Sequence, residues 1–170
     1  MPKNQDLTQG NIFKVLIKLA VPIMATSLVQ MAYNMTDMIW LGRTGPLSVA
    51  AVGTAGFFIW FGFAFIIISK IGAEVGIAQS IGSKNPAEGL KFASNSFMLA
   101  LLMGFIYGSV LIANSVSFIN FFNLNDNTVT QMAVSYLKTV SIGTLFMFMN
   151  PVFSGFFNGS GDSKTPFYIN

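Results

Sequence analysis

The chain has 170 residues, of which 53% are hydrophobic and only 9% are charged, whereas ordinary soluble domains carry about 25% charged residues. The net charge of +3 is spread along the chain, so no nucleic-acid partner is expected, and the lack of cysteine and histidine excludes disulfides, thiolate metal sites and an imidazole proton relay. This composition predicts an integral membrane protein.

Four stretches without a charged residue predict membrane-spanning helices, because a hydrocarbon core of about 30 Å needs about 20 apolar residues. These stretches are residues 19–36, 44–69, 92–125 and 139–161. With their flanking turns they predict spans at approximately 15–41, 47–81, 92–122 and 132–158, and a fifth span that begins near residue 165. The expected fold is an all-α membrane protein, a polytopic transmembrane helix bundle surrounded by the lipid bilayer.

The chain is expected to enter the first span through a short amphipathic helix at residues 7–19, which carries Lys14 and Lys18 beside apolar residues. Such a segment lies in the membrane interface. The first span then follows at Pro22. A proline near the start of a span removes a backbone hydrogen bond, so Pro22 is predicted to be either a tolerated kink or a working hinge.

Asp37 is a lone carboxylate near the outer end of the first span. An ionisable group is expensive in a membrane, about 2.5–3.5 kcal/mol at the bilayer centre. Residues three or four apart share a helix face. Stepping back from Asp37 gives a polar stripe made of Asn34 or Tyr33, then Gln30, then Thr26 or Ser27. Such a stripe is predicted to line a water-filled cavity between helices.

Two interpretations of Asp37 remain open. A carboxylate in a partly dry cavity can take up a proton or, with further oxygen ligands, hold Na⁺. Alternatively, Asp37 is a solvated interfacial charge that pairs with Arg43, close to the outer loop and Trp40.

The second predicted span is longer than the hydrocarbon core requires. Its last turns are therefore expected to project into the cytoplasm or to bend at Gly72 or Gly76. Lys70 and Glu74 lie there at i and i+4, a spacing that stabilises a helix modestly. Glu74 is accordingly interpreted as an interfacial charge rather than a second transport carboxylate.

The third and fourth spans carry signals for packing and bending. Gly104 and Gly108 form a G-x-x-x-G pattern that lets another helix approach closely. In the fourth span Pro151 follows Asn150, which predicts a kink or hinge at Pro151 and an Asn150 amide that lines an interior.

The positions of the basic residues predict the orientation in the membrane. With the N-terminus inside, the outside receives only Arg43 and Lys138, which fits the positive-inside rule. The inside receives Lys3, Lys14, Lys18, Lys70, Lys84, Lys91 and Lys164. We therefore expect a multi-pass protein of the cell membrane with a cytoplasmic N-terminus.

Motifs for enzymatic chemistry are absent. The sequence has no phosphate-binding G-x-x-x-x-G-K-[ST], no H-E-x-x-H and no nucleophile elbow, so no enzyme and no cofactor beyond a coupling ion is expected. Ten methionines and eighteen phenylalanines suit a pocket for flat organic cations, since thioethers repack easily and ring faces attract positive charge.

The chain resembles the multidrug and toxic compound extrusion (MATE) transporters, especially their N-terminal half. The resemblance spans nearly the whole chain, and its motifs are weak singly but specific in this order and spacing. They are Asp6-Leu7-Thr8-Gln9-Gly10-Asn11, Lys18-Leu19-Ala20-Val21-Pro22, Tyr33-Asn34-Met35-Thr36-Asp37, Trp40-Leu41-Gly42-Arg43, Ala51-Val52-Gly53-Thr54-Ala55, Gln79-Ser80-Ile81-Gly82 and Gly159-Ser160-Gly161-Asp162-Ser163-Lys164-Thr165-Pro166.

This resemblance implies a twelve-helix antiporter with two six-helix lobes, which expels drugs and other small organic cations in exchange for H⁺ or Na⁺. The first-helix acid that matches Asp37 is the cation-coupling residue of the N-lobe in that family, and Pro22 matches a proline associated with bending of the helix. Residues 1–170 are then expected to form an incomplete N-terminal lobe, helices 1–4 plus the start of helix 5, whose partner is the remainder of the transporter chain, including the second lobe.

One departure from the family is Asn158, which stands where the family often has arginine. Two alternative functions remain. The first is a lipid-linked sugar flippase of the same superfamily, whose cavity should be richer in arginine and lysine, whereas no basic residue is expected deep within these spans. The second is a non-transporting membrane protein or remnant, which would bind neither ion nor drug.

Overall fold

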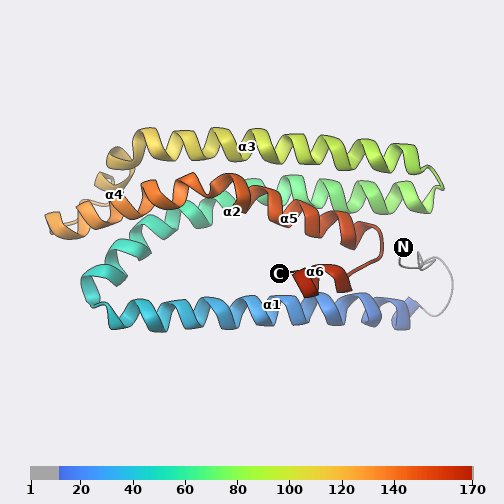
Figure 1. Cartoon of the computed structure of the whole chain (residues 1–170), viewed down its shortest axis with the longest axis horizontal. Helices are drawn as coiled ribbons and strands as arrows, with labels where there is room; N and C mark the ends of the chain where they lie inside the picture. The colour runs from blue at the N-terminus through green and yellow to red at the C-terminus, as the bar shows by residue number, and fades with distance from the viewer. Residues whose placement is uncertain (1–11, 170) are drawn as a thin grey trace.

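The computed structural model describes residues 12–169, and within them the chain forms six helices joined by short turns (Figure 1). The helices are α1 (Ile12–Arg43), α2 (Pro46–Gly82), α3 (Pro86–Asn120), α4 (Asn127–Ile142), α5 (Thr144–Gly159) and α6 (Lys164–Ile169). The predicted all-α fold is confirmed for this part of the chain.

The chain is a multi-pass membrane protein. Helices α1, α2 and α3 are each long and apolar enough to cross a membrane, and the bent pair α4–α5 is a fourth candidate span. Large apolar side chains point outward: Trp60 is 70% exposed and Phe105 is 65% exposed. Such a surface would be an aggregation liability in water, whereas in a bilayer it faces hydrocarbon.

The start of the first span differs from the prediction of a separate interfacial helix. Residues 7–11 lie outside the described part, but from Ile12 onward α1 runs without interruption through Pro22 to Arg43. Proline supplies a backbone φ that suits a helix and removes one hydrogen bond, and the loss of that bond alone does not end α1.

The fourth predicted span is two helices rather than one. Helices α4 and α5 meet at Gly143 and differ in direction by 49°, whereas Pro151 lies inside α5. The buried Thr144 hydroxyl lies at this break, where it donates to the carbonyl of Ser141 at 2.7 Å and to that of Gly104 in α3 at 3.5 Å. A side chain on Gly108 would collide with the same hydroxyl, so the Gly104–Gly108 pattern does allow a close helix approach, as predicted.

Helices α2, α3 and the α4–α5 pair form a closely packed bundle whose buried residues are mostly small. Its core has two clusters of buried residues: one holds Ala51, Ala55, Leu111, Ile119, Val129, Ala133 and Leu137, and the other holds Ala73, Ala100 and Val152. Small residues let helix backbones approach each other in membranes, where burial of large apolar side chains supplies little driving force.

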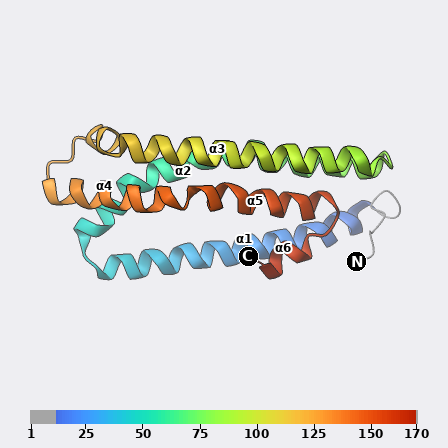
Figure 2. The ribbon, with the colours of Figure 1, turned by 45° about the horizontal axis from the view of Figure 1, so that its top comes forward.

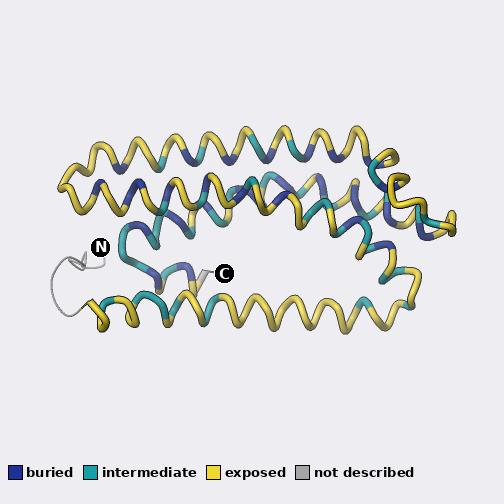
Figure 3. Tube along the Cα trace, turned by 180° about the vertical axis from the view of Figure 1, so that it is seen from behind, coloured by how far each residue is buried: buried dark blue, intermediate teal, exposed yellow. Residues whose placement is uncertain are grey.

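Helix α1 stands apart from this bundle (Figures 1 and 2). No described residue of α1 is buried, and its middle part, residues 27–40, is exposed throughout, as the yellow tube in Figure 3 shows. It contacts α2 and α6. The turn from α1 to α2 places Gly45 at φ 108, a conformation that glycine adopts without strain.

Aspartates cap two of the later helices at turns outside the spans. The Asp126 carboxylate accepts hydrogen bonds from the backbone N–H groups of Thr128 and Val129 at the start of α4. The Asp162 carboxylate accepts from the Thr165 hydroxyl and from backbone N–H groups of α6. The Thr165 side-chain hydrogen bond, the largest cause, lowers the pKa of Asp162, so the first turn of α6 is held in place by an ionised cap.

Candidate functional site

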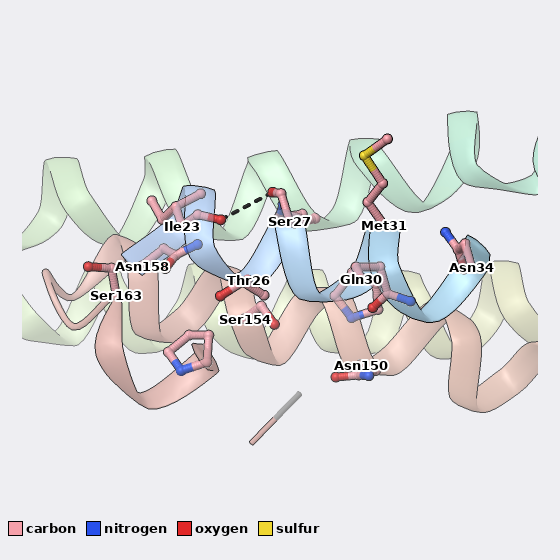
Figure 4. A pocket seen from close by; sticks show the side chains of 13 residues that line it. Ile23, Thr26, Ser27, Gln30, Met31, Asn34, Asn150, Ser154, Asn158 and Ser163 are labelled. Atoms are coloured by element: carbon pink, nitrogen blue, oxygen red, sulfur yellow. Dashed lines mark hydrogen bonds between the residues drawn. The ribbon is translucent and has the colours of Figure 1, made fainter. Parts of the chain in front are cut away.

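A cavity of about 440 Å³ lies between α1 and α5, within the range of sites for drug-sized ligands. Helix α2 and the first turn of α6 complete its wall (Figure 4). The lining residues are Ile23, Thr26, Ser27, Gln30, Met31, Asn34, Lys70, Asn150, Pro151, Ser154, Asn158, Ser163 and Pro166.

Two polar stripes face each other across this cavity. The α1 stripe is Thr26, Gln30 and Asn34, and the α5 stripe is Asn150, Ser154 and Asn158. Each stripe has four-residue spacing, which keeps its members on one helix face. The helices run in opposite directions, so Thr26 lies toward Ser154, and Gln30 toward Asn150 (Figure 4).

The hydroxyls of α1 are already engaged by their own helix. The Thr26 hydroxyl donates to the carbonyl of Pro22 at 3.0 Å, and Ser27 donates to that of Ile23 at 3.1 Å. In contrast, the Oδ1 atom of Asn158 is buried and has no hydrogen-bond partner. A buried acceptor without a partner is costly, so this wall of the cavity favours a donor group from water or a ligand.

The structure brings together four of the residues predicted to line a cavity, namely Thr26, Gln30, Asn34 and Asn150. Tyr33 is not among the lining residues. A helix turns about 100° per residue, so Tyr33 is rotated by about 60° from Gln30, on the side away from Asn34. Its side chain is 63% exposed.

Asp37 is exposed and lies one turn beyond Asn34, past the C-terminal end of the α1 stripe and outside the cavity lining. The Arg43 guanidinium lies over the Trp40 ring at 4.9 Å. The alternative in which Arg43 pairs with Asp37 therefore gains no support from this arrangement.

The sequence interpretation missed several cavity residues. Ser154 and Asn158 follow Asn150 at four-residue intervals, and this periodicity could have identified them. Lys70 was expected at the membrane interface, yet it lines the cavity. It does so because α5 packs its glycines directly on α2: a Cβ on Gly155 would lie 2.8 Å from the Lys70 carbonyl oxygen.

The chemical character of the lining also differs from the expectation of a methionine- and phenylalanine-rich pocket. Amides and hydroxyls dominate, with Met31 as the sole methionine and no phenylalanine among the described lining residues. A second hollow, lined by Met31, Asn34, Met35, Met38 and Ile39, lies farther along α1. Among the described residues, no group of three or more acidic, histidine or cysteine side chains is placed to hold a metal ion.

The sequence is similar to proteins of one family. The sequence model of the MatE family matches residues 22–170. The probable multidrug resistance protein NorM of Thermotoga maritima is 32% identical over 158 residues, which is 93% of this chain and 34% of the relative. The probable multidrug resistance protein YpnP of Bacillus subtilis is 26% identical over 166 residues, 96% of this chain and 37% of the relative. The chain therefore spans about a third of the length of these curated relatives.

The fold is similar to solved structures of the same kind. A crystal structure of MATE in complex with MaD5 matches this fold with a TM-score of 0.92 at 25% sequence identity. The match covers 99% of this chain and 38% of that protein. A second similar structure is a transporter of the MOP superfamily from Pyrococcus furiosus, described by the reverse polarity of its binding pocket. Its TM-score is 0.89 at 26% sequence identity, and the match covers 99% of this chain and 37% of that protein. Sequence and fold agree that this chain belongs to the MatE family, a family of membrane transporters and not of enzymes.

Proposed function

We propose that this chain supplies the ion- and substrate-binding helices of one lobe of a transporter that exports drugs and other organic cations in exchange for H⁺ or Na⁺. The observation that carries the proposal is the cavity between α1 and α5, whose two facing polar stripes lead to the carboxylate of Asp37. Relatives named as multidrug resistance proteins support the class of substrate. The remaining part of such a transporter would be the partner of this chain.

Asp37 is the proposed coupling residue. Its position beyond the cavity leaves a carboxylate that forms no ion pair with a described cation, and the Arg43 guanidinium lies over the Trp40 ring instead. Binding of H⁺ or Na⁺ would remove its negative charge, and an organic cation in the cavity would then lose an electrostatic partner. Competition between ion and drug for one charge, together with a cavity that opens to one side of the membrane at a time, would give exchange.

Pro22 and Pro151 are the proposed hinges. Pro22 lies at the inner end of the α1 stripe, where its carbonyl accepts the Thr26 hydroxyl, and Pro151 lines the cavity within α5. Each removes a helix hydrogen bond next to the cavity, so a bend at either proline would change the width of the cavity.

The proposed orientation places the N-terminus in the cytoplasm of a cell membrane. The start of α1, the α2–α3 turn and the α5–α6 turn lie at the same end of the molecule (Figure 1). This end carries Lys14, Lys84 and Lys164, whereas Arg43 lies at the opposite end. Such an asymmetry is typical of a lysine-rich cytoplasmic side.

The alternative of a lipid-linked sugar flippase gains less support. Recognition of a pyrophosphate would call for several basic groups, and Lys70 is the single basic residue among the described cavity residues.

The proposal is tested with Asp37→Asn, which keeps the shape of the side chain and removes its charge. Efflux of ethidium from cells that express the protein should fall at least about tenfold, because one charge–charge partner of the cation is lost. Glu74→Gln is the matched control, since Glu74 is a carboxylate of α2 that does not line the cavity, and it should transport normally. Ion-dependent efflux that persists in Asp37→Asn would refute the role of Asp37. Comparison of imposed pH and Na⁺ gradients would identify the coupling ion.

A further inference from the structure

The end of α1 carries a positive charge that no described side chain neutralises. Arg43, the last residue of α1, is exposed, and its guanidinium forms no ion pair with a described carboxylate. Instead it lies over the Trp40 ring, 4.9 Å from the ring centroid. Attraction to a ring face positions the charge but supplies no acceptor oxygen for the five N–H donors of the guanidinium. These donors are therefore available to a ligand.

Arg43 lies at the level of the lipid headgroups. Helix α1 has 32 residues, which corresponds to about 48 Å at 1.5 Å per residue, whereas the hydrocarbon core is about 30 Å thick. Because α1 and α2 are consecutive candidate spans, the turn that joins them lies at the membrane surface. The anions that a bilayer presents at this level are the phosphates of its lipids.

The charges around Arg43 favour an anion. Residues 38–48 contain no other charged residue. Helix α2 begins in the same turn, and no side-chain cap at Gly45 offsets the partial positive charge of its N-terminus. Asp37 is six residues before Arg43, which places it about 9 Å back along the helix axis and turned by about 120°. The Asp126 carboxylate, in the α3–α4 turn, already accepts from backbone N–H groups of α4.

The chemistry of the pair matches a phosphate group. A guanidinium binds two phosphate oxygens through parallel N–H···O hydrogen bonds, and the contact with Trp40 reduces the side-chain freedom that binding would cost. The Trp40 ring is 62% exposed, so lipid can reach it. A zwitterionic headgroup brings its own ammonium group, which Arg43 repels and which competes for the phosphate, so a lipid with a net negative charge fits better.

We propose that Arg43 and Trp40 form a binding site for the phosphate of an anionic phospholipid, which holds the end of α1 at the membrane surface. No described residue of α1 is buried, so a lipid bound at this end restrains a helix that the bundle itself holds weakly. The site is separate from the proposed transport function, since neither residue is among the described residues that line the cavity.

The test uses the two tryptophans of the chain, Trp40 and Trp60. In Trp60→Phe, Trp40 is the sole tryptophan, and the purified protein is placed in phosphatidylcholine vesicles that contain dibrominated phosphatidylglycerol or dibrominated phosphatidylcholine with the same chains. Bromine quenches tryptophan fluorescence at short range, so quenching reports which lipid lies beside Trp40. The relative association constant should favour phosphatidylglycerol about fivefold, as expected for one basic group at a membrane surface.

Arg43→Gln should abolish this preference, whereas Arg43→Lys should keep part of it, because the charge remains and the paired N–H geometry is lost. Trp40→Phe is the matched control. It leaves Trp60, which is 70% exposed within α2, and both brominated lipids should quench Trp60 equally. Lys138→Gln removes a basic residue of α4 and should leave the preference at Trp40 unchanged.

Equal quenching of Trp40 by the two lipids, or a preference that survives Arg43→Gln, would refute the site. A preference that Lys138→Gln abolishes as fully as Arg43→Gln would also refute it, because the attraction would then belong to the surface as a whole. None of these outcomes alters the expectation for ethidium efflux by Asp37→Asn, so failure of the lipid site and failure of the proposed function are distinguishable.

Discussion

Tyr107 is an example of how a single polar group is accommodated inside an apolar span. Its ring covers Gly62 of α2, where a Cβ would lie 2.8 Å from the ring. The Tyr107 hydroxyl donates to the backbone carbonyl of Phe58, which lies in α2 one turn before Gly62. The residue thereby fills the space left by a glycine and satisfies its own donor, as a tyrosine in hydrocarbon must.

Tyr107→Phe is expected to lower the free energy of unfolding in mixed micelles by about 1 kcal/mol, since hydrogen bonds between transmembrane helices contribute about 0.6–1.7 kcal/mol. The ring packing over Gly62 remains, so the fold should be kept. Tyr168→Phe serves as the control, because Tyr168 is 81% exposed and should change stability very little. Equal effects of both substitutions would contradict the assigned hydrogen bond.

Helices α2 and α5 are held together by a second G-x-x-x-G pattern, Gly155 and Gly159. A Cβ on Gly159 would lie 2.5 Å from the carbonyl oxygen of Glu74, and one on Gly155 would lie 2.8 Å from that of Lys70. Backbone therefore packs on backbone, with no side chain that could move aside. This contact also sets the distance between Lys70 and the polar stripe of α5.

Gly159→Ala should force α5 away from α2 and reduce the free energy of unfolding by about 1–3 kcal/mol, the usual range for overpacking. Gly56→Ala is the matched control: it lies in α2, and a Cβ there meets nothing within 4 Å, so stability should stay the same or rise slightly. Thermal unfolding in detergent measures the stability of both variants. A Gly159→Ala protein as stable as the control would show that α5 does not pack on α2 as described.

On the scale of the whole molecule, the arrangement of α1 decides how the cavity is formed. The bundle of α2, α3 and α4–α5 has its own buried core, whereas α1 contributes no buried described residue. Helix α1 can therefore tilt against the bundle without disrupting that core. Such a movement would widen or close the space between the two polar stripes.

The lack of natural cysteines permits a clean test of this arrangement. The double variant Gln30→Cys with Asn150→Cys should be bridged by a short bifunctional thiol reagent, because both side chains line the cavity from opposite helices. Bridging should block ethidium efflux, and reduction of a cleavable bridge should restore it. Val29→Cys with Asn150→Cys is the control, since Val29 does not line the cavity; bridging of this pair with equal yield would contradict the position of α1.

The sequence alone determined the membrane class, the helical fold and the α1 stripe of Thr26, Gln30 and Asn34, since local hydrophobicity and helix periodicity depend on residues near in the chain. The family followed from the resemblance of its motifs and is confirmed by the family model. Asp37 as a coupling site remains a prediction. Only the tertiary structure decided that Lys70 and Asn158 join the cavity, that Tyr33 does not, and that the fourth span breaks at Gly143. The position of Lys70 and the break at Gly143 depend on close contacts of α5 with α2 and of Thr144 with α3, which pair residues far apart in the chain. Asn158 does continue a four-residue pattern in α5, but only the tertiary structure shows that this face meets α1.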